Sequence, residues 1–196
     1  MIRNYWDSFY KKKRVPIKAS SFAKFAYTQV KKLNIKMYDI GCGNGRDTVF
    51  FNKKKFECIG IDKSKEIIKK NKKKFKRFKN KFLNYNFCHF FKKKNYEQFI
   101  LYSRFTWHSI NYEDEKNLIL SLKRNKNLKY ILIEARTIND SIYGEGKKVG
   151  KHEFVTSHYR RFIDSKVLKK KLSKIMKIIY FKESKNLAKF KNENPC

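Results

Sequence analysis

The sequence predicts an α/β domain built around a mostly parallel sheet. Apolar runs of strand length alternate along the chain with segments whose apolar residues recur at helical spacing. This alternation is typical of right-handed βαβ units, and no internal repeat or proline-rich linker interrupts it. At 196 residues the chain suits one domain with a core of its own, and we expect residues 1–196 to form it.

The first half of the chain predicts a helix and then two strand–helix units. Ser20 precedes a helically spaced apolar series, which indicates a helix behind a good N-cap. A short strand at 36–40 runs into a glycine-rich turn, which a helix at 45–52 follows. A second strand at 56–61 precedes a longer helix, which Ser64 caps and whose lysines face solvent.

The second half predicts further strands and two helices. A third strand is expected at 82–88 and a fourth at 99–103. Acidic residues at 113–115 fit the first turn of a helix, where the macrodipole favours them, and the apolar run 130–135 fits a strand buried on both faces. The remaining elements are, in order, a polar loop at 136–158, a helix capped by Asp164 and a last strand at 178–181.

The composition excludes several classes of protein. With 41% hydrophobic and 16% aromatic residues, the chain is not a disordered basic tail. Its longest apolar runs are too short to span a membrane, and its first residues lack the apolar core of a signal peptide, so we expect a cytoplasmic protein. The four cysteines form no C-x-x-C pair, which argues against a metal site, and Cys42 is interpreted as a small residue in a tight turn.

The net charge of +33 would attract polyanions. Only nine of the 50 basic residues are arginine, however, and lysine runs are spread along the whole chain, mainly near element ends and on solvated helix faces. We therefore interpret the charge mainly as solvated surface. Nucleic acid is an alternative partner that the sequence does not favour.

Three of the seven glycines lie together in the turn after the first strand, at Gly41, Gly43 and Gly45. Such a turn brings a ligand close to the backbone. Asp62 ends the second strand, where a carboxylate can accept both hydroxyls of a ribose, and no Gly-Lys-Ser/Thr of a phosphate loop follows the glycines. Asp39 would repel pyrophosphate but suits an ammonium group. S-adenosylmethionine, with an ammonium, a sulfonium and a ribose diol, matches these features.

These residues carry a resemblance to a known family. Asp39-Ile40-Gly41-Cys42-Gly43-Asn44-Gly45, followed by Asp62, resembles the first two motifs of the class I, Rossmann-like S-adenosylmethionine-dependent methyltransferases. The resemblance implies a Rossmann-like sheet with helices on both faces, S-adenosyl-L-methionine as cofactor and S-adenosyl-L-homocysteine as product. It implies cofactor contacts in the N-terminal segment 1–35, the glycine turn and the ends of strands two to four, at Trp6, Tyr10, Asp39, Gly41, Cys42, Gly43, Asp62, Lys63, Asn86, Phe87 and Ser103.

Two points qualify this resemblance. Both acids also fit structural roles, Asp39 as a turn residue and Asp62 as a helix cap. The family closes its sheet with an antiparallel seventh strand, and this chain stops at 193–196, where that strand should begin. We therefore expect the seventh strand to be absent and the sheet to pack more loosely there, or a neighbouring chain to compensate.

Arginine and histidine residues are expected at the carboxyl ends of strands four and five and in the loop 137–160, the edge where open α/β sheets bind ligands. Arginine suits phosphate and carboxylate groups, so we predict a small anionic acceptor over which the loop can close. Each of these residues also fits a structural role. The catalytic candidates are Arg104, His108 and His158, and the substrate candidates are Arg136, Tyr159, Arg160 and Arg161.

The acceptor chemistry is predicted from what the chain contains and lacks. Nothing resembles the Asn/Asp-Pro-Pro-Tyr/Phe signature of adenine-N6 and glutamine methyltransferases. Tyr-Trp-Asp near the start, Ser-Arg-Phe-x-x-His and His-Tyr-Arg-Arg-Phe together are similar to small methyltransferases of bacterial capsule and surface-polysaccharide clusters, among them enzymes that make O-methyl phosphoramidate groups.

The predicted function is methyl transfer to an oxygen of a phosphate- or sugar-containing acceptor in capsule biosynthesis. The alternatives are an RNA methyltransferase of the same fold and a catalytically inactive basic binding module. The sequence predicts no particular oligomeric state.

Overall fold

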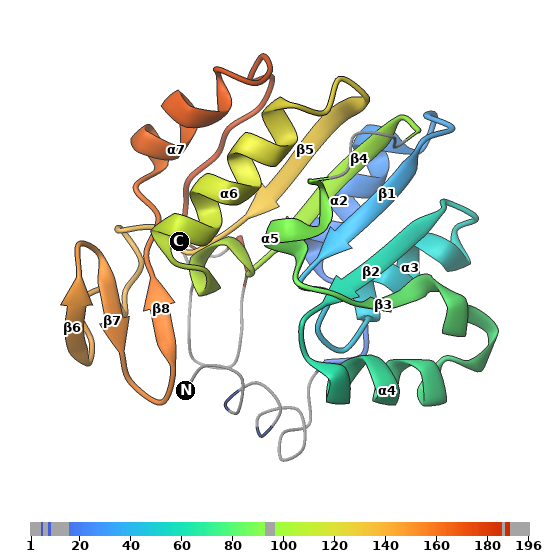
Figure 1. The fold of residues 1–196 in the computed structure, drawn as a ribbon, viewed down its shortest axis with the longest axis horizontal. Coiled ribbons are helices and arrows are strands. Elements are labelled where there is room, and N and C mark those ends of the chain that lie inside the picture. The colour runs from blue at the N-terminus through green and yellow to red at the C-terminus, as the bar shows by residue number, and fades with distance from the viewer. Residues whose placement is uncertain (1–4, 6–7, 9–15, 93–96, 186, 189–196) are drawn as a thin grey trace.

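The computed structural model describes residues 5, 8, 16–92, 97–185 and 187–188. Its main sheet contains five parallel strands in the order β3-β2-β1-β4-β5. Figure 1 shows them side by side, with their carboxyl ends along one edge. The predicted α/β fold with a parallel sheet is confirmed. The strands are β1 (Lys36–Ile40), β2 (Cys58–Asp62), β3 (Phe82–Asn84), β4 (Phe99–Arg104) and β5 (Leu128–Glu134).

Helices cover both faces of this sheet, as predicted. They are α2 (Ser21–Val30), α3 (Arg46–Lys53), α4 (Lys65–Lys74), the 3-10 helix η1 (Lys76–Lys81), α5 (Phe87–Phe90), the 3-10 turn η2 (Trp107–Ser109), α6 (Tyr112–Lys123) and α7 (Ser165–Leu172). α2 and α3 pack on one face, and α5, α6 and α7 pack on the other. Figure 1 shows α6 in front of the sheet and α2 behind it.

Alternate side chains of β4 enter the two layers of the core. Ile100 and Tyr102 pack with α2 and α3, while Leu101 packs with Trp107 and Leu118 on the α6 side. All five side chains are fully buried. A strand that is apolar on both faces is typical of parallel sheets covered by helices on each side.

The predicted N-caps begin the helices where the sequence placed them. Ser20 Oγ accepts a hydrogen bond from Ala23 N–H at 2.9 Å, and Ser64 Oγ accepts one from Ile67 N–H at 3.2 Å. The carboxylate of Asp164 caps α7 in the same way. Each cap satisfies a backbone donor that the first helical turn leaves without an intrahelical partner.

The third strand is shorter than the predicted 82–88. It ends at Asn84, and Asn86 then caps α5 by accepting a hydrogen bond from Cys88 N–H at 3.1 Å. An asparagine side chain that bonds the backbone locally competes with extension of a strand.

The segment predicted as a polar loop contains a second sheet. β6 (Lys147–Gly150), β7 (Glu153–Val155) and β8 (Tyr159–Arg161) form three antiparallel strands, so the loop prediction for 136–158 is wrong. β8 contacts η2, and Figure 1 shows the small sheet beside the carboxyl end of β5. The strands are too short and too polar to give a two-residue period that sequence alone reveals.

The predicted last strand is absent: residues 178–181 have no regular secondary structure. The chain here is held by side chains instead. The Tyr180 ring lies 5.2 Å from that of Phe25, and Glu183 accepts hydrogen bonds from Asn139 and Ser165 at 3.0 and 2.9 Å.

Within the described residues, no strand pairs with the outer edge of β5. Its residues 130–134 are half-buried, whereas the core residues 99–103 of β4 are buried. β5 is therefore an edge strand of the main sheet within the described residues.

None of the described helices combines the length and the hydropathy that crossing a bilayer requires.

Candidate cofactor and acceptor site

The glycine turn between β1 and α3 is left-handed at each of its three glycines. The φ angles of Gly41, Gly43 and Gly45 are 68°, 50° and 72°. A Cβ on Gly41 would lie 2.3 Å from Thr106 Oγ1, and one on Gly45 would lie 2.6 Å from Phe82. Side chains are therefore excluded here both by backbone conformation and by close neighbours.

The amides of this turn are used inside the protein. Gly41 N–H and Cys42 N–H donate to the carbonyl of Ile61 at 2.7 and 3.1 Å, and Gly43 N–H donates to Asp62 Oδ2 at 3.0 Å. A turn that binds phosphate aims such amides at its ligand. The amides of this turn already donate to protein acceptors, which agrees with the exclusion of pyrophosphate from the sequence.

Asp62 joins the turn to the start of α4. It is buried, its Oδ2 accepts from Gly43, and its Oδ1 accepts from Ser64 N–H at 2.9 Å. A carboxylate has about four acceptor positions. The structural role that the sequence left open for Asp62 is therefore real and is compatible with ribose binding.

Asp39 lies behind the turn and points toward α3. It is 3% exposed and accepts a hydrogen bond from Thr48 Oγ1 at 2.6 Å. Burial, together with the charge of Asp47, raises the pKa of Asp39 to about 7, although the hydrogen bond from Thr48 opposes the rise. Burial also raises the pKa of the Cys42 thiol well above its ordinary value, which fits a small packed residue and not a nucleophile.

Asp47 is a buried carboxylate that sequence reasoning missed. It accepts hydrogen bonds from Ser20 N–H at 2.8 Å, from Ser20 Oγ at 2.7 Å and from Tyr102 OH at 2.9 Å. It thereby ties the start of α2 and strand β4 to the helix that follows the glycines. Its neighbour Arg46, also missed, is mostly buried with its Nε 3.7 Å from Asp47 Oδ1. The position of Arg46 directly after the third glycine is the signal that could have found it.

The acceptor candidates gather around a buried histidine, His108. Burial lowers its pKa well below the ordinary value, and the charges of Arg136, Arg160, His158 and Arg104 lower it further. These five residues come from β4, η2, β5's end and the small sheet, so the structure brings together a group that the sequence could only list.

His108 is held as a neutral ring with a defined tautomer. Its Nδ1 accepts a hydrogen bond from Arg136 N–H at 3.3 Å, so the ring proton lies on Nε2. A ring in this state donates a hydrogen bond to a ligand and does not take a proton from it. The geometry therefore favours a positioning role for His108 over the predicted role as a base.

Two of the predicted arginines already have acidic partners. Arg104 Nε lies 2.7 Å from Glu134 Oε2, and the Arg104 guanidinium stacks on the Phe105 ring at 4.3 Å. Arg136 binds both carboxylate oxygens of Asp140 at 3.0 Å. These arginines are oriented by their partners, and each acid offsets charge that an anionic ligand would otherwise meet.

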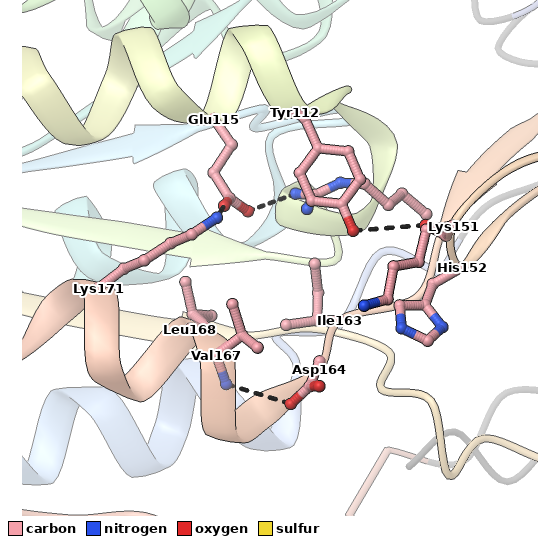
Figure 2. A pocket seen from close by; sticks show the side chains of 10 residues that line it. Tyr112, Glu115, Lys151, His152, Ile163, Asp164, Val167, Leu168 and Lys171 are labelled. Atoms are coloured by element: carbon pink, nitrogen blue, oxygen red, sulfur yellow. Dashed lines mark hydrogen bonds and ion pairs between the residues drawn. The ribbon is translucent and has the colours of Figure 1, made fainter.

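Arg161 lines the pocket that Figure 2 shows. This pocket of about 270 Å³ lies between α6, α7 and β8. Arg161 is 3% exposed and pairs with Glu115, which also accepts from Trp107 Nε1 at 2.9 Å and from Lys171 Nζ at 2.5 Å. Burial raises the pKa of Glu115, but Arg161 and Lys171 outweigh it, so this pKa lies below its usual range. Arg161 therefore has a structural role in this pocket, and its assignment to the substrate stays a prediction.

The remaining candidates are spread around the same edge. Ser103 is fully buried at the end of β4, and its Oγ has no hydrogen-bond partner among the described residues. The ring of Phe87 lies in the core. His158 stacks on Tyr5 at 4.5 Å, and Tyr159 OH donates to Glu153 at 2.8 Å.

For three further candidates the structure gives little or no information about contacts. Lys63, next to Asp62, is half-buried. Trp6 and Tyr10 lie outside the described residues.

A family model matches the part of the chain that contains the glycine turn. Residues 31–98 match a family model described as a methyltransferase domain. The matched segment contains the glycine turn and Asp62. No curated protein sequence shows significant similarity to the chain.

Several solved structures share the fold. An S-adenosylmethionine-dependent methyltransferase from Archaeoglobus fulgidus is 18% identical with a TM-score of 0.55, over 78% of this chain and 68% of that one. A glycopeptide N-methyltransferase complexed with S-adenosylhomocysteine is 12% identical with a TM-score of 0.57, over 81% and 78%. Phosphoethanolamine N-methyltransferase 1 of Haemonchus contortus, in complex with phosphoethanolamine and S-adenosylhomocysteine, is 14% identical with a TM-score of 0.64, over 86% and 38%.

The chain spans only part of some of these proteins. It covers 56% of a structure from a study of echinomycin biosynthesis, as well as 38% of the phosphoethanolamine enzyme. At these identities the likeness shows the fold, which is the Rossmann-like fold of class I methyltransferases.

Proposed function

We propose that this chain is an S-adenosylmethionine-dependent methyltransferase. The observation that carries the proposal is the glycine turn, whose amides are used internally while Asp62 stands beside it at the end of β2. A turn of glycines without side chains suits close approach by the aminocarboxypropyl arm of the cofactor, and a carboxylate at the second strand suits its ribose. The family match over 31–98 and the shared fold support the same assignment.

The acceptor in this proposal is a small anion with a phosphate or sugar group, methylated on oxygen, of the kind used in surface-polysaccharide assembly. Its support is the group of arginines around His108, namely Arg104, Arg136 and Arg160, although Glu134 and Asp140 partly offset the charges of the first two. The absence of an Asn/Asp-Pro-Pro-Tyr/Phe signature from the sequence also favours oxygen over an amino group.

The protonation of His108 fits an acceptor that is already ionised. When bound, the cofactor supplies a methyl group on a sulfonium. An anionic phosphate oxygen can attack this methyl group without help from a base, because it carries no proton to remove and needs only to be aligned with the methyl–sulfur bond. His108, with its proton on Nε2, can donate a hydrogen bond that orients such an acceptor. His158, half-buried at the same edge, is the candidate base for a hydroxyl acceptor.

Calorimetric titration with S-adenosylhomocysteine tests the cofactor assignment. We expect the wild type to bind, and Asp62→Asn to bind roughly tenfold more weakly or worse because hydrogen bonds to a charged group are lost. Glu113→Gln, an exposed acid in α6, is the matched control and should bind as the wild type does. Because Asp62 also holds Gly43 and Ser64, the thermal unfolding of each variant is measured as well. Wild-type protein that binds neither cofactor nor product contradicts the assignment.

Release of S-adenosylhomocysteine on a panel of acceptors tests the second part. Phosphorylated alcohols and phosphorylated sugars should be methylated in preference to their unphosphorylated forms. Phosphoethanolamine is the probe for nitrogen, because one structural relative is bound to it. Faster turnover on its amine than on any phosphate or sugar oxygen would overturn the oxygen assignment.

A further inference from the structure

The segment after α7 exposes four consecutive large hydrophobic side chains. Ile178, Ile179, Tyr180 and Phe181 are 38%, 75%, 60% and 47% exposed. Scattered single apolar residues are normal on a protein surface, but a contiguous group marks an interaction site. α7 itself has no buried residue, so the helix that leads into the segment also lies on the surface.

Lysines surround this apolar group. Within 165–185 the sequence has eight lysines and one acid, Glu183. The flanking Lys177 and Lys182 are exposed, and Lys169 Nζ lies 4.0 Å from the Phe181 ring. A positive field and exposed apolar side chains thus occupy the same surface.

The segment is fixed to the body of the protein at Tyr180 and at Glu183. Tyr180 packs against Phe25 of α2, and Glu183 is bonded to Asn139 and Ser165. An anchored segment presents Ile178 and Ile179 outward without first having to become ordered, so docking costs little conformational entropy.

We propose that this surface, Lys177 to Lys182 with the adjoining lysines of α7, docks onto a bilayer that contains anionic lipid. Lysines draw the protein to the negative surface, and the two isoleucines enter the boundary between headgroups and acyl chains. Tyrosine and lysine are both favoured at that depth, where one end of the side chain is apolar and the other is solvated. This association is peripheral and is independent of the proposed methyltransferase activity.

Charge and side-chain type favour a bilayer over two other occupants. A second copy of the chain would bring together two molecules that each carry a net charge of +33. RNA binding relies on arginine and on aromatic stacking, whereas the residue exposed most here is the aliphatic Ile179. An anionic bilayer satisfies both the charge and the aliphatic side chains.

Co-sedimentation with lipid vesicles tests the proposal. We expect binding to vesicles of phosphatidylcholine mixed with phosphatidylglycerol, and little binding to phosphatidylcholine alone. The change Lys177→Gln with Lys182→Gln should weaken binding roughly fivefold for each lysine removed. The matched charge control is Lys65→Gln with Lys69→Gln on the exposed side of α4, which Figure 1 shows far from α7. It should weaken binding much less.

The apolar part has its own pair of variants. Ile179→Asn should weaken binding to the mixed vesicles about tenfold, whereas Ile17→Asn, at a position that is 66% exposed elsewhere, should leave it unchanged. Thermal unfolding and S-adenosylhomocysteine titration of both variants should match the wild type, because neither side chain is in the core.

Three results would overturn the proposal. One is equal binding to both kinds of vesicle, and another is wild-type binding by Ile179→Asn. The third is that the protein does not bind vesicles but instead forms a dimer in solution, or binds RNA at physiological salt, and that Ile179→Asn abolishes this association.

Discussion

Gly41 is the residue at which backbone conformation and side-chain packing act together. Its φ is 68°, and an added Cβ would meet Thr106, whereas Gly144 has a φ of 92° with nothing within 4 Å. Gly144→Ala should therefore cost only the left-handed strain, about 1–2 kcal/mol of unfolding free energy. Gly41→Ala should cost roughly 1–3 kcal/mol more from overpacking, and it should abolish cofactor binding.

Denaturant unfolding of both variants measures this difference. Combining Gly41→Ala with Thr106→Gly should recover the packing part of the loss and leave the strain. Equal losses for Gly41→Ala and Gly144→Ala would show that Thr106 gives way freely.

The carboxyl of Asp39 makes stability depend on pH in a defined direction. Its pKa rises from 3.8 to about 7 on folding, so between these values the folded protein binds more protons than the unfolded one. The unfolding free energy therefore falls as pH rises through this window. In Asp39→Asn this contribution is missing, so the stability of the variant relative to the wild type should increase over the same range.

Urea unfolding of both proteins at several pH values checks the prediction for Asp39. A constant difference between Asp39→Asn and the wild type would mean that Asp39 is ionised throughout.

The sequence could predict the candidate site residues that belong to a local motif. Gly41, Gly43 and Asp62 follow from spacing alone, because a strand, a turn and the end of the next strand are close in the chain. The tautomer of His108 could not be predicted, since it depends on an amide 28 positions away. The ion pair of Arg161 could not be predicted either, because its partner Glu115 is 46 positions away in the sequence.

The helices and strands that the sequence predicted correctly are those with a long apolar pattern or a clear N-cap. The apolar residues 178–181, predicted as a strand, form none, because a strand needs a neighbouring strand to pair with. Contacts of Tyr180 with Phe25 and of Glu183 with Ser165 hold the segment instead. β6 to β8 show the converse. They are short and polar, and only their pairing with one another makes them strands.

The Glu115 network joins three elements, α6, β8 and α7. Arg161 is 3% exposed at its side chain and Lys171 is 38% exposed, although both bind the same carboxylate. Arg161→Met should cost about 3–5 kcal/mol of stability, because it leaves a buried carboxylate with one exposed partner. Lys171→Met should cost at most about 1 kcal/mol, because Arg161 still neutralises Glu115.

Thermal unfolding measures both losses in the Glu115 network. Since Arg161 also donates to Ile110 and Trp107, its variant should disturb η2 and weaken acceptor turnover more than cofactor binding. Equal destabilisation by Arg161→Met and Lys171→Met would contradict this account.

The whole molecule carries a charge of +33 on 196 residues, and this charge opposes the compact state. Like charges repel more strongly when the chain folds, and salt screens the repulsion over about 8–10 Å at moderate ionic strength. The melting temperature should therefore rise with sodium chloride, by roughly 2–4 °C for each kcal/mol of repulsion removed.

Lys65→Gln with Lys69→Gln removes a like-charged pair one turn apart on the exposed face of α4. This variant should melt higher than the wild type at low salt and respond less to added salt. A melting temperature that falls with salt would instead mean that ion pairs such as Arg104–Glu134 and Arg161–Glu115 outweigh the net repulsion.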